Sequence, residues 1–122
     1  MTKLLIASHE VHATAIRDAL NGKFDIHLCT DACKVAAAMK QLQPDAMVLA
    51  LNMPGRDGIS ILSEAFAYIP PVTLVLTNFT NDHVINTCAY LGVSCILQIP
   101  CHTEYICTCL QDLLECNQGG RI

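Results

Sequence analysis

Short apolar segments alternate five times with segments of helical periodicity, and this alternation limits what the chain can fold into. Residues 46–51 are apolar throughout, which is typical of a strand buried on both faces of a parallel sheet. Ala13, Ile16 and Leu20 recur at helical spacing after the first apolar segment. Alternating units of this kind predict a three-layer α/β/α sandwich around a five-stranded parallel sheet. We expect strands at 3–7, 24–29, 46–51, 72–77 and 93–97, and helices at 11–20, 31–42 (capped by Thr30 or Asp31), 59–68, 81–91 and 103–116.

Length and composition fit one globular domain. The chain has 122 residues, 52% hydrophobic and 15% charged, so it can bury a sizeable core. Its net charge of -4 argues against direct binding of nucleic acid or an anionic membrane. The apolar run 4–7 is too short for a secretory signal, and polar residues interrupt the stretch 83–103, so we expect a cytoplasmic protein. We assign residues 1–117 to the domain and 118–122 to a tail or the start of a linker.

The segment from Pro44 to Gly58 carries the most specific motif, with the sequence PDAMVLALNMPGRDG. It resembles the third-strand signature of response-regulator receiver domains, P-D-[apolar]4-D-[apolar]-x-M-P-x-x-D-G. The segments 74–77 and 92–100 resemble the fourth strand and the run G-A-x-x-[FY]-[apolar]-x-K-P of the same family. The resemblance extends over residues 1 to about 117. It implies the (βα)5 receiver fold, CheY-like or flavodoxin-like, with strand order 2-1-3-4-5.

In that family, five positions carry the chemistry of phosphoryl transfer. Two acids after the first strand hold Mg²⁺, and an Asp at the end of the third strand takes the phosphoryl group. A Thr or Ser after the fourth strand bonds the phosphate, and a Lys before the last Pro pairs with it. Carboxylates suit a hard cation, and the cation and Lys stabilise the charge of the transferred group.

This chain departs from the family at the acid pair. Ser8 and His9 align with the two acids, because Ala13 and Ile16 then lie four and seven residues after His9, on the apolar face of the first helix. A shift by one residue would give the pair His9 and Glu10. Either pair makes a poor Mg²⁺ site without a third carboxylate. We therefore expect no Mg²⁺, no other metal and no cofactor.

The other positions differ as well. Ala50 stands where the phosphoacceptor Asp is found, and an alanine methyl cannot form an acyl phosphate. Ile99 replaces the Lys, while Thr77 is retained and could bond an anion or cap the following helix. Asp57 is expected to cap the helix after its loop. The resemblance also implies a cis peptide bond before Pro100. Together these features predict a degenerate pseudo-receiver without a catalytic site.

Two further groups of side chains have alternative interpretations. His9 with His12 could bind a soft metal, although exposed histidines at a helix start explain the pattern as well. The eight cysteines have no paired zinc-binding spacing, and we interpret them as free, small buried hydrophobic residues. They are Cys29, Cys33, Cys88, Cys95, Cys101, Cys107, Cys109 and Cys116.

The segment 81–116 is expected to form an interaction surface. In the receiver fold it supplies the fourth helix, fifth strand and fifth helix, a face through which many family members dimerise. Asp82 is the only charged residue between positions 65 and 103, so this face would be unusually apolar. Tyr90, Ile106 and Leu110 are the candidate contacts of a homodimer or a partner protein.

These observations predict a non-enzymatic regulatory module. It would belong to a two-component response regulator, act through protein–protein contacts without Asp phosphorylation, and form the N-terminal part of a transcriptional regulator. The alternative is a small-molecule or redox sensor that uses the emptied pocket or the cysteines. An enzyme is disfavoured because no nucleophile–base pair or metal set converges at the strand ends.

Overall fold

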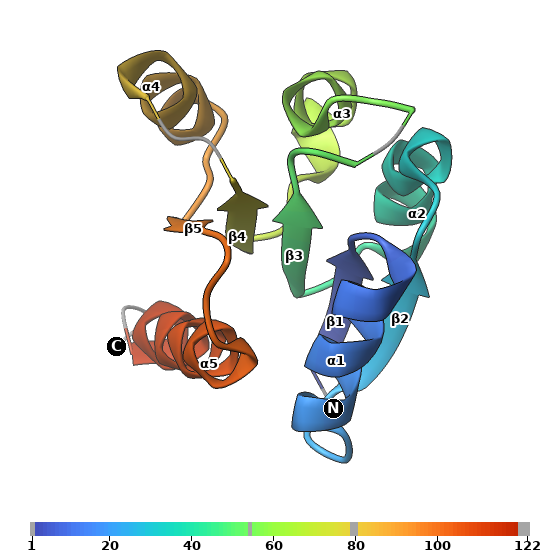
Figure 1. Ribbon diagram of the computed structural model, residues 1–122, viewed down its shortest axis with the longest axis vertical. Helices are drawn as coiled ribbons and strands as arrows, with labels where there is room; N and C mark the ends of the chain where they lie inside the picture. Colours follow the sequence, from blue (N-terminus) through green and yellow to red (C-terminus); the bar gives the residue numbers. More distant parts are fainter. Residues whose placement is uncertain (1, 54, 79–80, 120–122) are drawn as a thin grey trace.

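The computed structural model describes residues 2–53, 55–78 and 81–119 of the chain. Strands and helices alternate as the sequence predicts (Figure 1). The strands are β1 Lys3–Ala7, β2 Asp25–Cys29, β3 Ala46–Ala50, β4 Val72–Thr77 and β5 Cys95–Gln98. The α-helices are α1 Glu10–Leu20, α2 Val35–Leu42, α3 Gly58–Glu64, α4 Asp82–Tyr90 and α5 Thr103–Gly119, with 3-10 helices η1 Ala32–Lys34 and η2 Phe66–Tyr68.

The five strands form one parallel sheet in the order β2-β1-β3-β4-β5, which confirms the expected strand order. β3 lies between β1 and β4 and is buried along its whole length, as is β4. In a parallel sheet that helices cover on both faces, such strands have no solvent-facing side and need no polar alternation. For this reason, the apolar segments of the sequence predicted the bounds of β3 and β4 closely.

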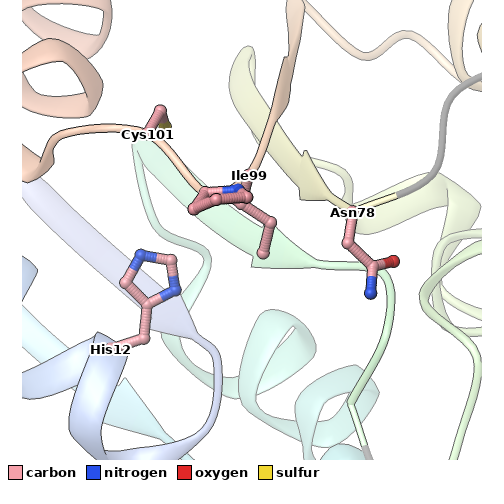
Figure 2. A pocket seen from close by; sticks show the side chains of 5 residues that line it. His12, Asn78, Ile99 and Cys101 are labelled. Atoms are coloured by element: carbon pink, nitrogen blue, oxygen red, sulfur yellow. The ribbon is translucent and has the colours of Figure 1, made fainter.

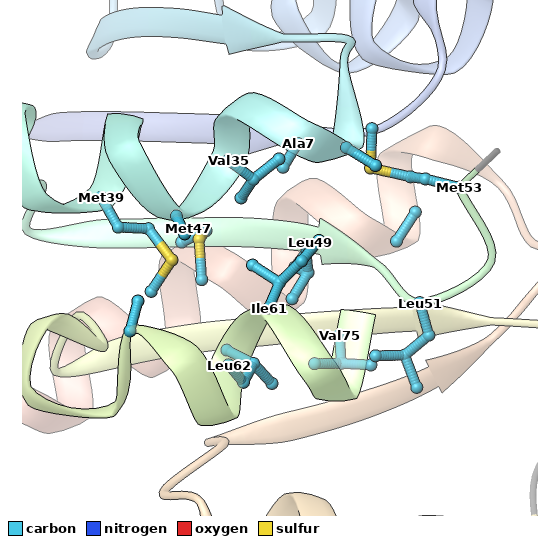
Figure 3. Close-up of a cluster of buried hydrophobic side chains, with 14 of the residues drawn as sticks. Ala7, Val35, Met39, Met47, Leu49, Leu51, Met53, Ile61, Leu62 and Val75 are labelled. Atoms are coloured by element: carbon cyan, nitrogen blue, oxygen red, sulfur yellow. The ribbon is translucent and has the colours of Figure 1, made fainter. Parts of the chain in front are cut away.

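The core consists of two hydrophobic clusters, one on each face of the sheet. Met47 and Leu49 of β3 point into the cluster shared with α2, α3 and α4, which Figure 3 shows in part. Ala46 and Val48 point into the cluster shared with α1 and α5. Successive side chains of a strand point to opposite faces, so one strand supplies both layers. The three-layer sandwich is therefore confirmed.

Several predicted helix and strand boundaries were wrong in detail. Asp31 caps the 3-10 helix η1 and not the α-helix itself, because its carboxylate accepts a 2.9 Å hydrogen bond from the Cys33 amide. The predicted helix 59–68 ends early and continues as η2. β5 begins later than predicted, because the Val93 amide closes the end of α4 by donating to the Cys88 carbonyl.

The last helix is longer than predicted. α5 continues through Gly119, beyond the predicted end of the helix at residue 116, and the assignment of residues 1–117 to the domain and 118–122 to a tail or linker stays a prediction. The segment 117–119 contains no proline, and a single Gly costs only about 1 kcal/mol within a helix. The remaining part of the predicted tail, residues 120–122, lies outside the described residues.

Gly58 allows the loop after β3 to fold tightly back on the strand. Its amide donates a 3.0 Å hydrogen bond to the Leu51 carbonyl. A Cβ atom at this position would lie 2.8 Å from the Leu51 Cα and 2.6 Å from its Cδ2. The first of these is a backbone atom that cannot move without displacing the end of β3. The glycine is thus required by close approach of two backbone segments.

We predict that Gly58→Ala destabilises the protein by about 1–3 kcal/mol, because the added methyl group forces the backbone of Leu51 to shift. Urea unfolding followed by circular dichroism measures the change. Ser63→Ala on the exposed side of α3 is the matched control and should change the unfolding free energy by less than about 0.5 kcal/mol. Equal effects of the two substitutions would contradict the steric argument.

Candidate functional site

The candidate site lies at the carboxyl edge of the sheet, where three buried side chains end adjacent strands. Ser8 follows β1, Ala50 ends β3 and Thr77 ends β4. Ala7 pairs with Leu49 and Ala50 with Leu76, which brings the three positions to the same edge. Ala50 is 7% exposed and contributes only a methyl group. The predicted convergence of these positions is present, and none of them carries a carboxylate.

The side chains do not fit Mg²⁺, the ion that the fold family implies. Ser8 is fully buried, and its Oγ has no hydrogen-bond partner within the described part of the chain. His9 is the N-cap of α1 without a side-chain cap bond, and Glu10 begins the helix; both are exposed. In either register, the buried residues that the structure describes at this edge supply hydroxyl groups and no negatively charged oxygen. A divalent cation would find no charge-neutralising ligand among them.

Thr77 is bonded across to the loop after β3. Its hydroxyl donates to Asn52 Oδ1 at 3.1 Å, and the Asn78 amide donates to the same oxygen at 3.3 Å. Thr77 does not cap the following helix, because it still belongs to β4; Asn81 caps α4 and accepts from the Val84 amide at 2.9 Å. The capping alternative for Thr77 was therefore wrong.

Asn52 is a functional candidate that sequence reasoning missed. Its side chain contacts both the last residue of β4 and the first residue after it. The signal in the sequence is a carboxamide two residues after Ala50, in the run Asn-Met-Pro that resembles the receiver motif. An asparagine in a loop is common for turn formation alone, so its position did not indicate a partner.

Asp57 also differs from its prediction. It occupies the N-cap position of α3, as expected, but its carboxylate makes no capping hydrogen bond. The backbone geometry of the loop, fixed by the contact of Gly58 with Leu51, brings Asp57 to the cap position without directing its side chain to the helix. The prediction that Asp57 occupies the N-cap position was therefore confirmed, whereas the capping hydrogen bond expected from its carboxylate is not formed.

A cavity of about 320 Å³ opens beside these residues (Figure 2). Figure 2 shows the His12 ring of α1 directed toward Ile99, with Asn78 on the other side of the cavity. Pro100 and Cys101 complete the lining, and the Ile99–Pro100 peptide bond is cis as predicted. Among the residues that the structure describes, this lining has no charged side chain. Ile99 therefore leaves an apolar wall at the position where the family has Lys.

His12 and Cys101 are the titratable side chains in the described lining of this cavity. Burial and the neighbouring His9 lower the pKa of His12 from its usual 6.5. The two rings lie 5.8 Å apart between centroids and are tilted by 37°. Within residues 2–53, 55–78 and 81–119, no three His, Cys, Asp or Glu side chains form a group that could hold a metal ion. The soft-metal interpretation of His9 and His12 thus has no third ligand in the described residues.

The cysteines are free thiols, as expected, but they are not uniformly buried. Cys88 and Cys107 are buried, whereas Cys33 and Cys116 are exposed, so the interpretation as buried hydrophobic residues was wrong for the latter two. Cys33 lies on the outer side of η1, and Cys116 lies near the end of α5, away from the sheet. The remaining thiols are half-buried. Burial raises the pKa of the Cys88 and Cys107 thiols.

The face formed by α4, β5 and α5 presents different residues from those predicted. Tyr90 is 83% exposed, in agreement with its selection as a contact. Ile106 and Leu110 are 0% exposed and pack in the cluster with α1, so both were wrong as contacts. They are four residues apart on α5, which places them on one helix face, and that face is turned to the sheet. Ile85 of α4 and Tyr105 of α5 are exposed instead.

A groove of about 450 Å³ runs along this face. Ile85 and Ala89 of α4 form one wall, and Cys95 and Ile96 of β5 form the other. Among its described lining residues there is no charged side chain. The described lining of the groove is therefore uncharged and mixes aliphatic side chains with the polar Ser94 and Gln98, while Asp82 and Glu104 are exposed elsewhere on α4 and α5.

The lowered pKa of His12 predicts a pH-dependent stability. The unfolded chain binds a proton at His12 more readily than the folded chain does, so stability is present above about pH 6.5 and decreases as the pH falls below it. His12→Gln should flatten this part of the stability curve, measured by urea unfolding between about pH 7.5 and pH 5. His83→Gln on the exposed side of α4 is the control; an unchanged slope in His12→Gln would contradict the assignment.

Comparison with known structures identifies the fold. The signal receiver domain of a LuxO repressor protein from Vibrio parahaemolyticus superposes with a TM-score of 0.84 at 15% identity, covering 98% of this chain and 95% of that one. A two-component response regulator from Clostridium difficile gives a TM-score of 0.83 at 17% identity, covering 94% of this chain and 97% of that one.

None of the helices that the structure describes has the length and apolar character needed to span a membrane.

Sequence comparison agrees at the level of distant relatives. No family model matches the chain. A protein-glutamate methylesterase/protein-glutamine glutaminase from Vibrio cholerae is 28% identical over 93% of the chain and 32% of its own length. The DNA-binding transcriptional activator DevR/DosR from Mycobacterium tuberculosis is 28% identical over 74% of the chain and 43% of its own length. The chain thus spans less than half the length of these curated relatives, and it has the receiver fold of two-component response regulators.

Proposed function

We propose that the chain is a regulatory receiver module of a two-component response regulator that acts through protein contacts without phosphorylation of an aspartate. The observation that carries the proposal is the methyl group of Ala50 at the end of β3, buried at the site of the family's acceptor. Ser8 and Thr77, the other buried side chains at the ends of the neighbouring strands, offer hydroxyl groups and no carboxylate oxygen.

The surroundings of Ala50 support the same proposal. Phosphoryl transfer requires a cation and positive groups that stabilise the charge on the transferred oxygens. Here Ile99 provides an apolar side chain where the Lys would stand, and Glu10 lies exposed at the start of α1. The edge is neutral in its described lining, so it would neither bind Mg²⁺ nor stabilise a phosphoryl group.

The domain would act as the N-terminal part of a longer transcriptional regulator. The relative DevR/DosR is named a DNA-binding transcriptional activator, and this chain spans 43% of it. The methylesterase relatives indicate that other output domains occur beside similar segments. The net charge of -4 fits a domain that leaves DNA contact to another part of the protein. A cytoplasmic location is part of the proposal.

The face of α4, β5 and α5 is the surface proposed for the contact. Tyr90, Ile85 and Tyr105 are exposed on it, and the described lining of the groove between α4 and β5 has no charged side chain. Exposed apolar surface of this kind marks an interaction site more often than a free surface. In a symmetric homodimer the same face would contact itself. The sensor alternative has the cavity beside His12 in its favour, but the named relatives and neighbours favour the signalling role.

The direct test of the proposed function is treatment with acetyl phosphate and Mg²⁺. We expect the intact mass to stay unchanged, because Ala50 offers no acceptor oxygen. A hydroxylamine-labile increase of about 80 Da would contradict the proposal. A phosphorylatable receiver domain treated in parallel confirms that the reagent is active.

Restoring the acceptor alone should also fail. In Ala50→Asp the new carboxylate lacks the acid pair that would hold a cation and the Lys that would pair with the phosphoryl group. The intact mass should therefore again stay unchanged after treatment with acetyl phosphate and Mg²⁺. Burial disfavours the charged form, so the substitution should destabilise the protein by about 1–3 kcal/mol at neutral pH and less at pH below about 4, where the carboxyl group is protonated. Ala67→Asp on the exposed η2 is the control. Phosphorylation of Ala50→Asp would show that the edge binds Mg²⁺ after all.

Self-association through the proposed face is tested at Tyr90. Under reducing conditions we expect the protein to dimerise, and Tyr90→Glu to weaken the dimer at least about tenfold, because a charge would enter an apolar contact. Sedimentation velocity at several concentrations measures the association. Tyr68→Glu in η2 is the matched control on another surface. If the unaltered protein and Tyr90→Glu are both monomers at high concentration, the homodimer is excluded, and contact with a different partner protein remains as the proposed use of this face.

A further inference from the structure

One oxygen atom joins the two loops at the centre of the carboxyl edge. Asn52 Oδ1 accepts the hydroxyl hydrogen of Thr77 at 3.1 Å and the amide hydrogen of Asn78 at 3.3 Å. Thr77 is almost completely buried, whereas Asn52 and Asn78 are exposed. The bonds therefore connect a fixed residue of the sheet to a loop on the surface.

The backbone places Asn52 for this contact. β3 and β4 pair from Ala46 with Val72 to Ala50 with Leu76, and the pairing continues as the Leu51 amide donates to the Leu76 carbonyl at 2.9 Å. Asn52 is the next residue, so it lies beside Thr77. The contact of Gly58 with Leu51 holds the other end of the same loop. The carboxamide is thus positioned by main-chain bonds on both sides.

The chemistry of the contact is that of an oxygen acceptor facing two donors. A side-chain hydroxyl and a backbone amide at the end of a strand are suited to hold one partly negative oxygen. By its resemblance to receiver domains, Thr77 would bond an oxygen of a transferable phosphate group. In this chain the acceptor is a carboxamide oxygen that belongs to the protein itself and is always present.

We propose that Asn52 is an internal acceptor that holds the backbone amide of Asn78 at the end of β4, in place of an oxygen supplied by an external signal. The proposal rests on the proposed function, since it explains how a module without an acceptor aspartate could present a constant surface. Asn78 lies only three residues before Asn81, the N-cap of α4. The contact therefore lies close in the sequence to the start of the helix that carries Ile85 and Tyr90.

Hydrogen exchange of backbone amides, followed by NMR, tests the contact directly. Asn52→Ala removes the acceptor, so the Asn78 amide should exchange at least about fivefold faster. Asn52→Asp keeps an acceptor oxygen and should retain the protection. Thr77→Val frees the carboxamide and should accelerate Asn78 less, and the double variant should exchange no faster than Asn52→Ala alone, because the bonds share one oxygen.

Two controls separate this effect from general destabilisation. Asn21→Ala removes an exposed carboxamide at the end of α1 and should leave Asn78 unchanged. The amide of Val48, in the centre of β3, should exchange at the same rate in all variants. Unprotected exchange of Asn78 in the unaltered protein, equal rates in Asn52→Ala and Asn21→Ala, or Asn52→Asp behaving like Asn52→Ala would each overturn the proposal.

Failure of the proposed function would be recognised separately. Phosphorylation by acetyl phosphate is read as a mass increase and does not depend on the exchange rate of Asn78. A phosphorylated protein with a protected Asn78 amide would refute the phosphorylation-independent function and retain the internal contact. An unphosphorylated protein with an unprotected Asn78 amide would refute the internal contact alone.

Discussion

The burial of β3 on both faces is the constraint on which the rest of the structure depends. The strand lies between β1 and β4, and its side chains supply the hydrophobic clusters of both layers. Each of its buried residues removes apolar surface from water on the side where a helix packs. Because the strand ends between two neighbours, its last residue, Ala50, also lies at the centre of the carboxyl edge. One strand thus determines both the packing and the position of the site.

At the carboxyl edge, the chain lacks both the acidic and the basic side chains that receiver domains carry there. A cluster of carboxylates at this place would repel one another without a cation, and a lysine would be costly to bury without them. The chain has replaced the members of both signs, with Ser8 and Ala50 on one side and Ile99 on the other. A partial replacement would have left an unpaired charge in a poorly solvated place. At the neutral edge, the Thr77 hydroxyl donates to Asn52 Oδ1, while the buried Ser8 hydroxyl has no hydrogen-bond partner among the described residues.

The sequence was sufficient for the layers, because an apolar run such as 46–50 is typical of a strand buried on both faces of a parallel sheet, and the resemblance to receiver domains supplied the strand order. It was not sufficient for the orientation of α5. That helix carries apolar residues on more than one side, so periodicity did not distinguish Ile106, which faces the sheet, from Tyr105, which faces solvent. Asn52 was missed for another reason: its partners are Thr77 and Asn78, 25 and 26 positions away, and only the pairing of β3 with β4 makes them neighbours.

The uneven burial of the cysteines has a practical consequence. Cys33 and Cys116 are exposed, while burial keeps thiols such as Cys88 and Cys107 protonated and slow to react. A maleimide spin label at limiting concentration would therefore attach first to η1 and to α5, which belong to opposite layers of the sandwich. The chain carries, without substitution, a pair of attachment points across its sheet. Pulsed electron paramagnetic resonance could then measure the distance between the two spin labels, and so the separation of the two helical layers, in solution.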